Sequence, residues 1–176
     1  SSKMLDAFLR QWPSAVIGGT GTNSVLTVEE VLGTSWPHID YSDYPGFDVS
    51  MGSTMQGCRF RCSFCAVPKK EGRPRSTNSI GTIWRGDPYP RKLLLLDGDF
   101  FGQPENEWRS RIDEMKEGGF RVCLKQGINI RTITDDQAAA LASIEYRCTK
   151  FQRRRIYCAW DRLQDERRFF DGVDRL

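Results

Sequence analysis

Short apolar segments alternate with helix-like segments between residues 47 and 171, and this alternation limits the fold of the chain more than any other feature. The apolar segments are residues 47–51, 91–96, 120–125 and 155–160. The connections between them are long enough for crossovers that place consecutive strands parallel. The run of four leucines in the second segment is typical of a strand buried on both faces. The pattern therefore predicts an α/β fold with a parallel sheet.

Helix boundaries are marked by the residues that usually begin and end helices. Pro104 opens one predicted helix, and Gly118-Gly119 ends it. Thr134-Asp135-Asp136-Gln137 has the layout of a capping box that opens the next helix. A further helix is predicted over residues 163–170, and a short amphipathic one over residues 3–11.

Three of the cysteines lie within eight residues, directly after the first predicted strand and Gly57. Cys58, Cys62 and Cys65 have the spacing Cys-x3-Cys-x2-Cys, so three thiolates of one loop can bind one metal centre. A cubane iron–sulfur cluster has four irons, and three ligands leave one iron without a protein ligand. Such an open position is typical of a catalytic metal site, and α/β barrels place their chemistry at this end of their strands.

A zinc site is the alternative that the cysteines leave open. Cys123, Cys148 and Cys158 are isolated, and His38 is the only histidine, so no second ligand pair completes a structural zinc site. Cys123 falls in the middle of a predicted strand, which favours a buried apolar role.

At the cysteine segment the sequence resembles the radical S-adenosylmethionine (SAM) superfamily, whose signature has this spacing with an aromatic residue, here Phe64, before the third cysteine. The resemblance implies a partial (β/α) barrel with about four of the six β-α units of the family. It implies a [4Fe-4S] cluster on Cys58, Cys62 and Cys65, with SAM chelated to the open iron. It also implies reductive cleavage of SAM to a 5′-deoxyadenosyl radical that acts on an unknown substrate.

The resemblance also implies contacts with SAM at the ends of the strands. Asp97-Gly98-Asp99 resembles the stretch that meets the SAM amino group, and an ammonium near a partly buried cluster needs a charged acceptor. Gln126, Asn129 and Arg131 are candidate contacts with SAM or substrate, and Asp161 is a candidate for the ribose hydroxyls. Alternatively, Asp97 and Asp99 cap the turn that follows them, and Asp161 caps the last helix.

The N-terminal part resembles the end of a cobalamin-binding-type domain that precedes the barrel in one branch of the superfamily. Residues 12–32 carry the likeness to that domain, and residues 40–47 resemble its linker. Within the superfamily, the sequence resembles uncharacterised members of that branch. We expect a remnant and linker over residues 1–45 and a partial barrel over residues 46–176. The sequence has no Asp-x-His-x-x-Gly motif for a cobalt ligand, so cobalamin is not implied.

Charge is unevenly distributed along the chain. Residues 58–92 hold nine basic and two acidic residues, whereas residues 1–57 hold two basic and six acidic ones. The basic residues nearest the cysteines are Arg59, Arg61, Lys69, Lys70, Arg73 and Arg75. Clustered cations raise the local concentration of anions, so an anionic substrate such as RNA is one hypothesis, beside a peptide or a small molecule. Ordinary solvated charge and contacts with the SAM carboxylate are the alternative.

Two functions of different classes follow from the sequence. The first is a radical SAM enzyme that takes electrons from a reductant such as flavodoxin or ferredoxin. The second is a non-catalytic module whose zinc or iron–sulfur centre stabilises a basic nucleic-acid-binding surface. The longest apolar run, residues 93–96, is far shorter than the ~20 residues that span a bilayer. An oxygen-sensitive cluster needs a reducing compartment, so the cytoplasm is expected.

Overall fold

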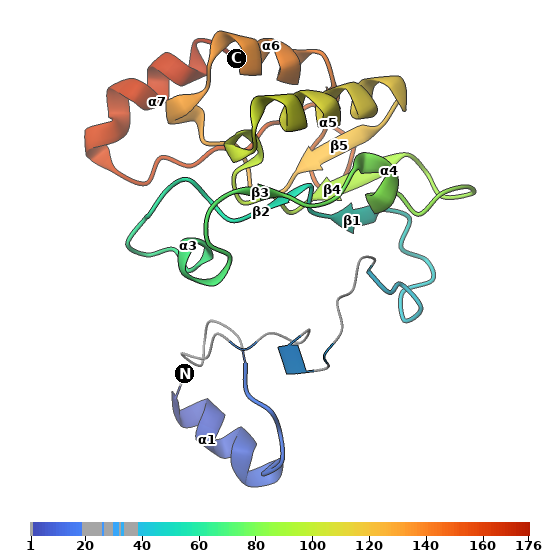
Figure 1. Ribbon diagram of the computed structural model, residues 1–176, viewed down its shortest axis with the longest axis vertical. Helices are drawn as coiled ribbons and strands as arrows, with labels where there is room; N and C mark the ends of the chain where they lie inside the picture. Colours follow the sequence, from blue (N-terminus) through green and yellow to red (C-terminus); the bar gives the residue numbers. More distant parts are fainter. Residues whose placement is uncertain (1, 19–25, 27–29, 32, 34–38) are drawn as a thin grey trace. The chain divides into compact units, whose positions relative to one another are not determined.

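The computed structural model describes residues 2–18, 26, 30, 31, 33 and 39–176 (Figure 1). The chain divides into two compact units, residues 1–37 and 38–176, each of which is described by itself. In the first unit, helix α1 (Ser2–Gln11) confirms the predicted amphipathic helix. Most of the stretch likened to a cobalamin-binding domain lies outside the described residues, so that likeness stays a prediction.

The second unit is built on a four-stranded parallel sheet. Its strands are β1 (Ser50–Gly52), β4 (Lys92–Leu95), β5 (Arg121–Leu124) and β6 (Glu145–Tyr146), in the order β1-β4-β5-β6. Each neighbouring pair is parallel, as the alternation of segments predicts. Among the described strands no pairing closes this sheet, so the partial barrel stays a prediction.

The fourth strand is not the one that the sequence predicts. Residues 155–160 contribute only an isolated bridge between Ile128 and Cys158, and β6 takes the place beside β5. The reason is a tight turn after β6, in which the Phe151 N–H binds the Cys148 carbonyl at 2.8 Å and the Cys148 N–H binds the Arg153 carbonyl at 2.8 Å. After this turn the chain meets the segment that follows β5 and not β5 itself, where the Ile128 N–H binds the Tyr157 carbonyl at 2.9 Å.

Three longer helices lie on one side of the sheet (Figure 1). They are α5 (Glu105–Glu117), α6 (Asp135–Ala142) and α7 (Glu166–Val173). Pro104 and Gly118 cap α5, and Thr134 and Gln137 form both bonds of the capping box of α6, so these signals are confirmed. The shorter elements are α3 (Val67–Lys70), α4 (Ile80–Ile83), η2 (Phe100–Gly102), η3 (Ile130–Thr132) and η4 (Leu163–Asp165).

The two faces of the sheet contribute to different hydrophobic clusters. Because side chains alternate along a strand, Leu93 and Leu95 join the large core that contains α5 and α6, whereas Leu94 packs into a small cluster on the other face. Cys123 belongs to that small cluster with Val49 and is fully buried. Its predicted apolar role is confirmed.

A separate two-stranded ribbon carries the cysteines. Strands β2 (Met55–Gln56) and β3 (Arg75–Ser76) pair antiparallel, with Gln56 opposite Arg75. Residues 57–74 form the excursion between them, which we call the cysteine loop. The loop thus begins five residues after β1 ends, close to the carboxyl ends of the parallel strands.

Candidate functional site

Hydrogen bonds at its base hold the two ends of the cysteine loop together. The Cys58 N–H binds the Gly72 carbonyl at 3.3 Å, and the Gly57 N–H binds the Glu71 carboxylate at 2.9 Å. The Arg75 guanidinium binds the Glu71 carbonyl and the Gln56 side chain, each at 2.5 Å. The loop is therefore closed by bonds within the chain itself, without a ligand.

Gly57 is needed at the start of this loop for two reasons. Its φ of +85° lies in the left-handed region, which favours glycine. A Cβ at this position would lie 2.3 Å from the Arg73 carbonyl oxygen, so a side chain would force the two ends of the loop apart. The glycine before the first cysteine thus has a structural reason.

Asp97 is a buried carboxylate at the end of β4, with 3% of its surface exposed. Its Oδ1 accepts hydrogen bonds from the Thr54 N–H at 2.6 Å and the Met55 N–H at 3.0 Å, and its Oδ2 accepts one from the Thr54 hydroxyl at 3.0 Å. Burial raises the pKa of Asp97 to about 6, although these bonds act to lower it. The carboxylate fixes the turn between β1 and β2, and its contact with the SAM ammonium stays a prediction.

Asp99 binds the cysteine loop directly. Its carboxylate accepts from the Arg59 guanidinium at 2.8 and 2.9 Å, a two-bond geometry, and from the Arg59 N–H at 3.2 Å. It makes no side-chain cap to η2, so for Asp99 the capping alternative is wrong. A Cβ on Gly98 would lie 3.6 Å from the Gly57 carbonyl oxygen. Asp97, Gly98 and Asp99 therefore all lie close to the cysteine loop or to the turn that precedes it.

The three clustered cysteines are half-buried in the loop. The Cys65 N–H binds the Cys62 carbonyl at 3.0 Å, and the Phe60 N–H approaches the Cys58 Sγ at 3.4 Å. Burial raises the pKa of the Cys58 thiol, and the negative charge of Asp99 acts in the same direction, whereas the hydrogen bond from the Phe60 N–H acts to lower it.

Three thiols of one loop are the donor set that an iron–sulfur cluster uses, so the residues fit that group. Within the described part of the chain, no three cysteine, histidine or carboxylate side chains are already arranged to hold a metal ion. Binding would therefore require the thiols to lose their protons and to converge.

A cavity of about 460 Å³ adjoins the loop and brings together residues that are far apart in sequence. It is lined by Phe60, Arg61, Cys62, Ser63, Phe64, Arg131, Asp161 and Arg162. Its volume is within the range of small-molecule sites. Four residues predicted for the metal or SAM, Cys62, Phe64, Arg131 and Asp161, thus share one cavity, which we call the first cavity.

Arg131 is held in the first cavity by partners from two other parts of the chain. Its Nη1 lies 2.5 Å from the buried Asp165 carboxylate, and its Nε binds the Asn129 side chain at 3.2 Å. Its guanidinium lies 5.5 Å from the centre of the Phe60 ring, and that of Arg59 lies 5.4 Å from the same ring. The sequence gives no signal for Asp165, because it lies inside a predicted helix. Gln126 is exposed and lines neither this cavity nor the one described next.

A second cavity of about 400 Å³ also adjoins the cysteine loop. It is lined by Cys58, Arg59, Arg61, Pro68, Gly72, Arg73 and Pro74. Cys58 and Cys62 therefore line different cavities, and Arg61 lines both.

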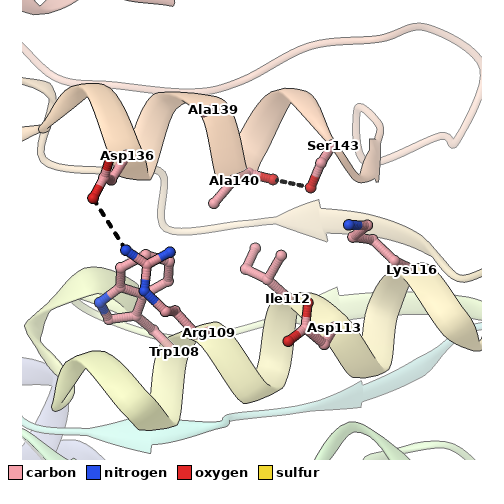
Figure 2. A pocket seen from close by; sticks show the side chains of 9 residues that line it. All are labelled: Trp108, Arg109, Ile112, Asp113, Lys116, Asp136, Ala139, Ala140 and Ser143. Carbon is pink, nitrogen blue, oxygen red and sulfur yellow. Dashed lines mark hydrogen bonds and ion pairs between the residues drawn. The ribbon is translucent and has the colours of Figure 1, made fainter.

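A third cavity, of about 280 Å³, lies between α5 and α6 (Figure 2). Arg109 points across it to Asp136 at 3.1 Å and also binds Glu105 at 2.7 Å, so its charge already has partners. None of the residues predicted for the metal or SAM lines it. We read it as a groove between packed helices.

Comparisons with known proteins give one partial likeness. No family model matches the chain, and no solved structure gives a significant match. A CDK5RAP1-like protein from rice (Oryza sativa subsp. japonica) is 30% identical over 109 residues, which are 57% of this chain and 16% of that protein. The chain thus spans about a sixth of this relative. That relative belongs to the radical SAM family, so the match supports a link between the chain and this family. No helix of the described residues is long and apolar enough to cross a membrane.

Proposed function

We propose that the chain carries the cluster-binding part of a radical SAM enzyme. The observation that carries this proposal is a closed loop with three half-buried cysteines beside the first cavity. The partial likeness to the CDK5RAP1-like protein supports it. The substrate is unknown, and flavodoxin or ferredoxin is proposed as the electron donor.

In this proposal the residues of the chain would have the following roles. Cys58, Cys62 and Cys65 hold the cluster, which, when bound, supplies the electron that cleaves SAM to methionine and a 5′-deoxyadenosyl radical. Asp99 keeps the loop in position through Arg59. Arg131 and Asp161 line the first cavity and provide a cation for the SAM carboxylate and an acceptor for its ribose hydroxyls. Positioning of the cofactor and exclusion of water are what a protein contributes to cofactor chemistry.

Anaerobic reconstitution with iron and sulfide tests the proposal. We expect about four irons per chain and a brown protein that absorbs near 400 nm, as thiolate-bound iron–sulfur clusters do. Cys58→Ala, Cys62→Ala and Cys65→Ala should each prevent cluster formation, because each removes one of three ligands. Iron analysis and the visible spectrum are the measurements.

Cys158→Ala is the matched control, because Cys158 is exposed and lies far along the chain from the loop. It should keep the full iron content. A full cluster in any of the three loop variants would contradict the assignment, and stoichiometric zinc in the purified protein would favour the non-catalytic module. Calorimetry with SAM then separates a chain that binds this cofactor from a cluster-binding piece that does not.

A further inference from the structure

The basic residues around the cysteine loop fall into two groups once their contacts are considered. Arg59 is bound to Asp99, and Arg75 is bound to Gln56 and to the Glu71 carbonyl. For the other four, Arg61, Lys69, Lys70 and Arg73, the structure shows no hydrogen bond or ion pair of the side chain with any described residue. The sequence alone does not separate these groups.

The nearby carboxylates are already engaged. Asp99 holds Arg59, and the Glu71 carboxylate accepts from the Gly57 N–H. Neither is paired with a free cation of the loop. Neither carboxylate lines the second cavity, and all the charged residues of its lining are arginines.

Two of the free cations line this cavity. Arg61 and Arg73 border the space of about 400 Å³ together with Arg59, whose charge Asp99 already balances. The remaining wall consists of Pro68, Pro74, Gly72 and Cys58 and contains no carboxylate. A cavity with this lining attracts an anion and offers no competing negative group.

From this arrangement we infer that the second cavity is a binding site for a compact phosphate-bearing ligand. Guanidinium groups bind phosphate through two parallel hydrogen bonds, and two unpaired arginines in one cavity provide four or more donors. The volume is that of a small-molecule site. Aromatic rings, which would stack the bases of a single-stranded nucleic acid, are absent from its lining.

The second cavity, and with it the inferred phosphate site, borders the cysteine loop. Arg61 lines both the first and the second cavity, and Cys58 forms part of the wall of the second. A phosphate-bearing ligand here would lie beside the cysteine loop, in a different cavity from the one that Phe64 and Asp161 line. The inference rests on the arginines and is independent of the proposed cluster.

Calorimetric titration of the full chain, without added iron, with pyrophosphate at low salt tests the inference. We expect binding that weakens by about tenfold or more in Arg61→Ala and in Arg73→Ala, because each loses hydrogen bonds to a charged group. Lys70→Ala is the matched control: it removes one free cation of the same loop that does not line the cavity. It should change the affinity by less than about threefold.

Three results would overturn the inference. The first is no binding of pyrophosphate at low salt. The second is an equal loss in all three variants, which would indicate a diffuse positive surface. The third is that a single-stranded RNA binds and depends on both arginines while pyrophosphate does not bind. Reconstitution of the same variants gives a separate readout: unchanged iron content with weakened pyrophosphate binding shows that the arginines serve the ligand and not the cluster.

Discussion

At the scale of single residues, the carboxylates after β4 are the most informative. Asp97 and Asp99 are both nearly fully buried, and both bind backbone or side chains of the segment that leads into the cysteines. The sequence places two carboxylates at the end of a strand but does not show that they hold residues about forty positions earlier. The two carboxylates therefore stabilise the conformation of the cysteine loop and of the turn that precedes it.

Asp97 makes folding stability depend on pH. Because burial raises its pKa to about 6 in the folded chain, above the ~3.9 of an unfolded aspartate, the folded state favours the protonated form. The favourable contribution is complete below pH ~4 and is lost as the pH rises through ~6, a change of roughly 3 kcal/mol in the free energy of unfolding. Asp97→Asn, which cannot titrate, should lack this dependence. Urea unfolding at several pH values measures both proteins.

Asp97→Ala is the companion variant. It leaves the Thr54 and Met55 N–H groups buried without an acceptor, so we expect a loss of roughly 2–4 kcal/mol below pH ~4 and a smaller loss at pH 7, where the wild type no longer has the contribution of the raised pKa. If the difference between wild type and Asp97→Asn stays constant from pH 4 to pH 7, the raised pKa is not present in the folded protein.

At the scale of elements, α7 packs closely on η3 because Gly172 has no side chain. A Cβ on Gly172 would lie 2.1 Å from the Ile130 carbonyl oxygen, so only glycine allows the helix to pack here. The same η3 carries Arg131, and Asp165 at the start of α7 binds it. The packing of α7 therefore affects the position of Arg131, which lines the first cavity.

Gly172→Ala should lower the free energy of unfolding by about 1–3 kcal/mol, because it overfills a tight contact. Gly81→Ala in α4 is the control: the nearest atom to its Cβ would be the Ser79 Oγ at 3.8 Å, an ordinary contact. That change should be neutral or stabilise by up to about 1 kcal/mol, since alanine is the better helix former. Denaturation in urea compares them, and equal effects would mean that α7 does not pack tightly on η3.

The helices and strands show which features the sequence can predict. α5 and α6 were predictable because Pro104 and Thr134 act within a few residues of themselves. β6 was not, because two residues without an apolar pattern become a strand only through pairing with β5. The partners of Arg59 and Arg131 were not predictable for the same reason, since each lies more than thirty residues away. Local signals define elements, and tertiary contacts define the site.

At the scale of the whole molecule, the core belongs to the second unit. The buried hydrophobic residues of the described chain run from Val49 to Phe151. The N-terminal segment of this unit is attached through Tyr41, whose hydroxyl accepts from the Met51 N–H at 2.6 Å. The Arg85 guanidinium lies 4.0 Å from the centre of the Tyr41 ring and 3.6 Å from that of Tyr89.

Two N-terminal deletions should separate the contribution of the first unit to thermal stability from the contribution of Tyr41. Without residues 1–37 the remaining chain should fold with a Tm within about 4 °C of that of the full chain, the largest shift that a loss of 1 kcal/mol produces at this size. Removal of residues 1–45, the division expected from the sequence, also removes Tyr41 and should lower the Tm further. Thermal unfolding followed by circular dichroism measures both. An equal Tm for the two shortened chains would show that Tyr41 does not anchor the segment.

The sequential strand order has a consequence for synthesis on the ribosome. Because the order is β1-β4-β5-β6, each strand pairs with one already made. The hydrogen bonds that hold the cysteine loop and the turn before it join residues no later than Asp99, although the ring of Phe60 also lies beside Arg131. The loop therefore has all partners of these hydrogen bonds before β5 and β6 are synthesised. Its thiols can take their native neighbours early, before the later cysteines Cys123, Cys148 and Cys158 emerge to compete for iron or for oxidation.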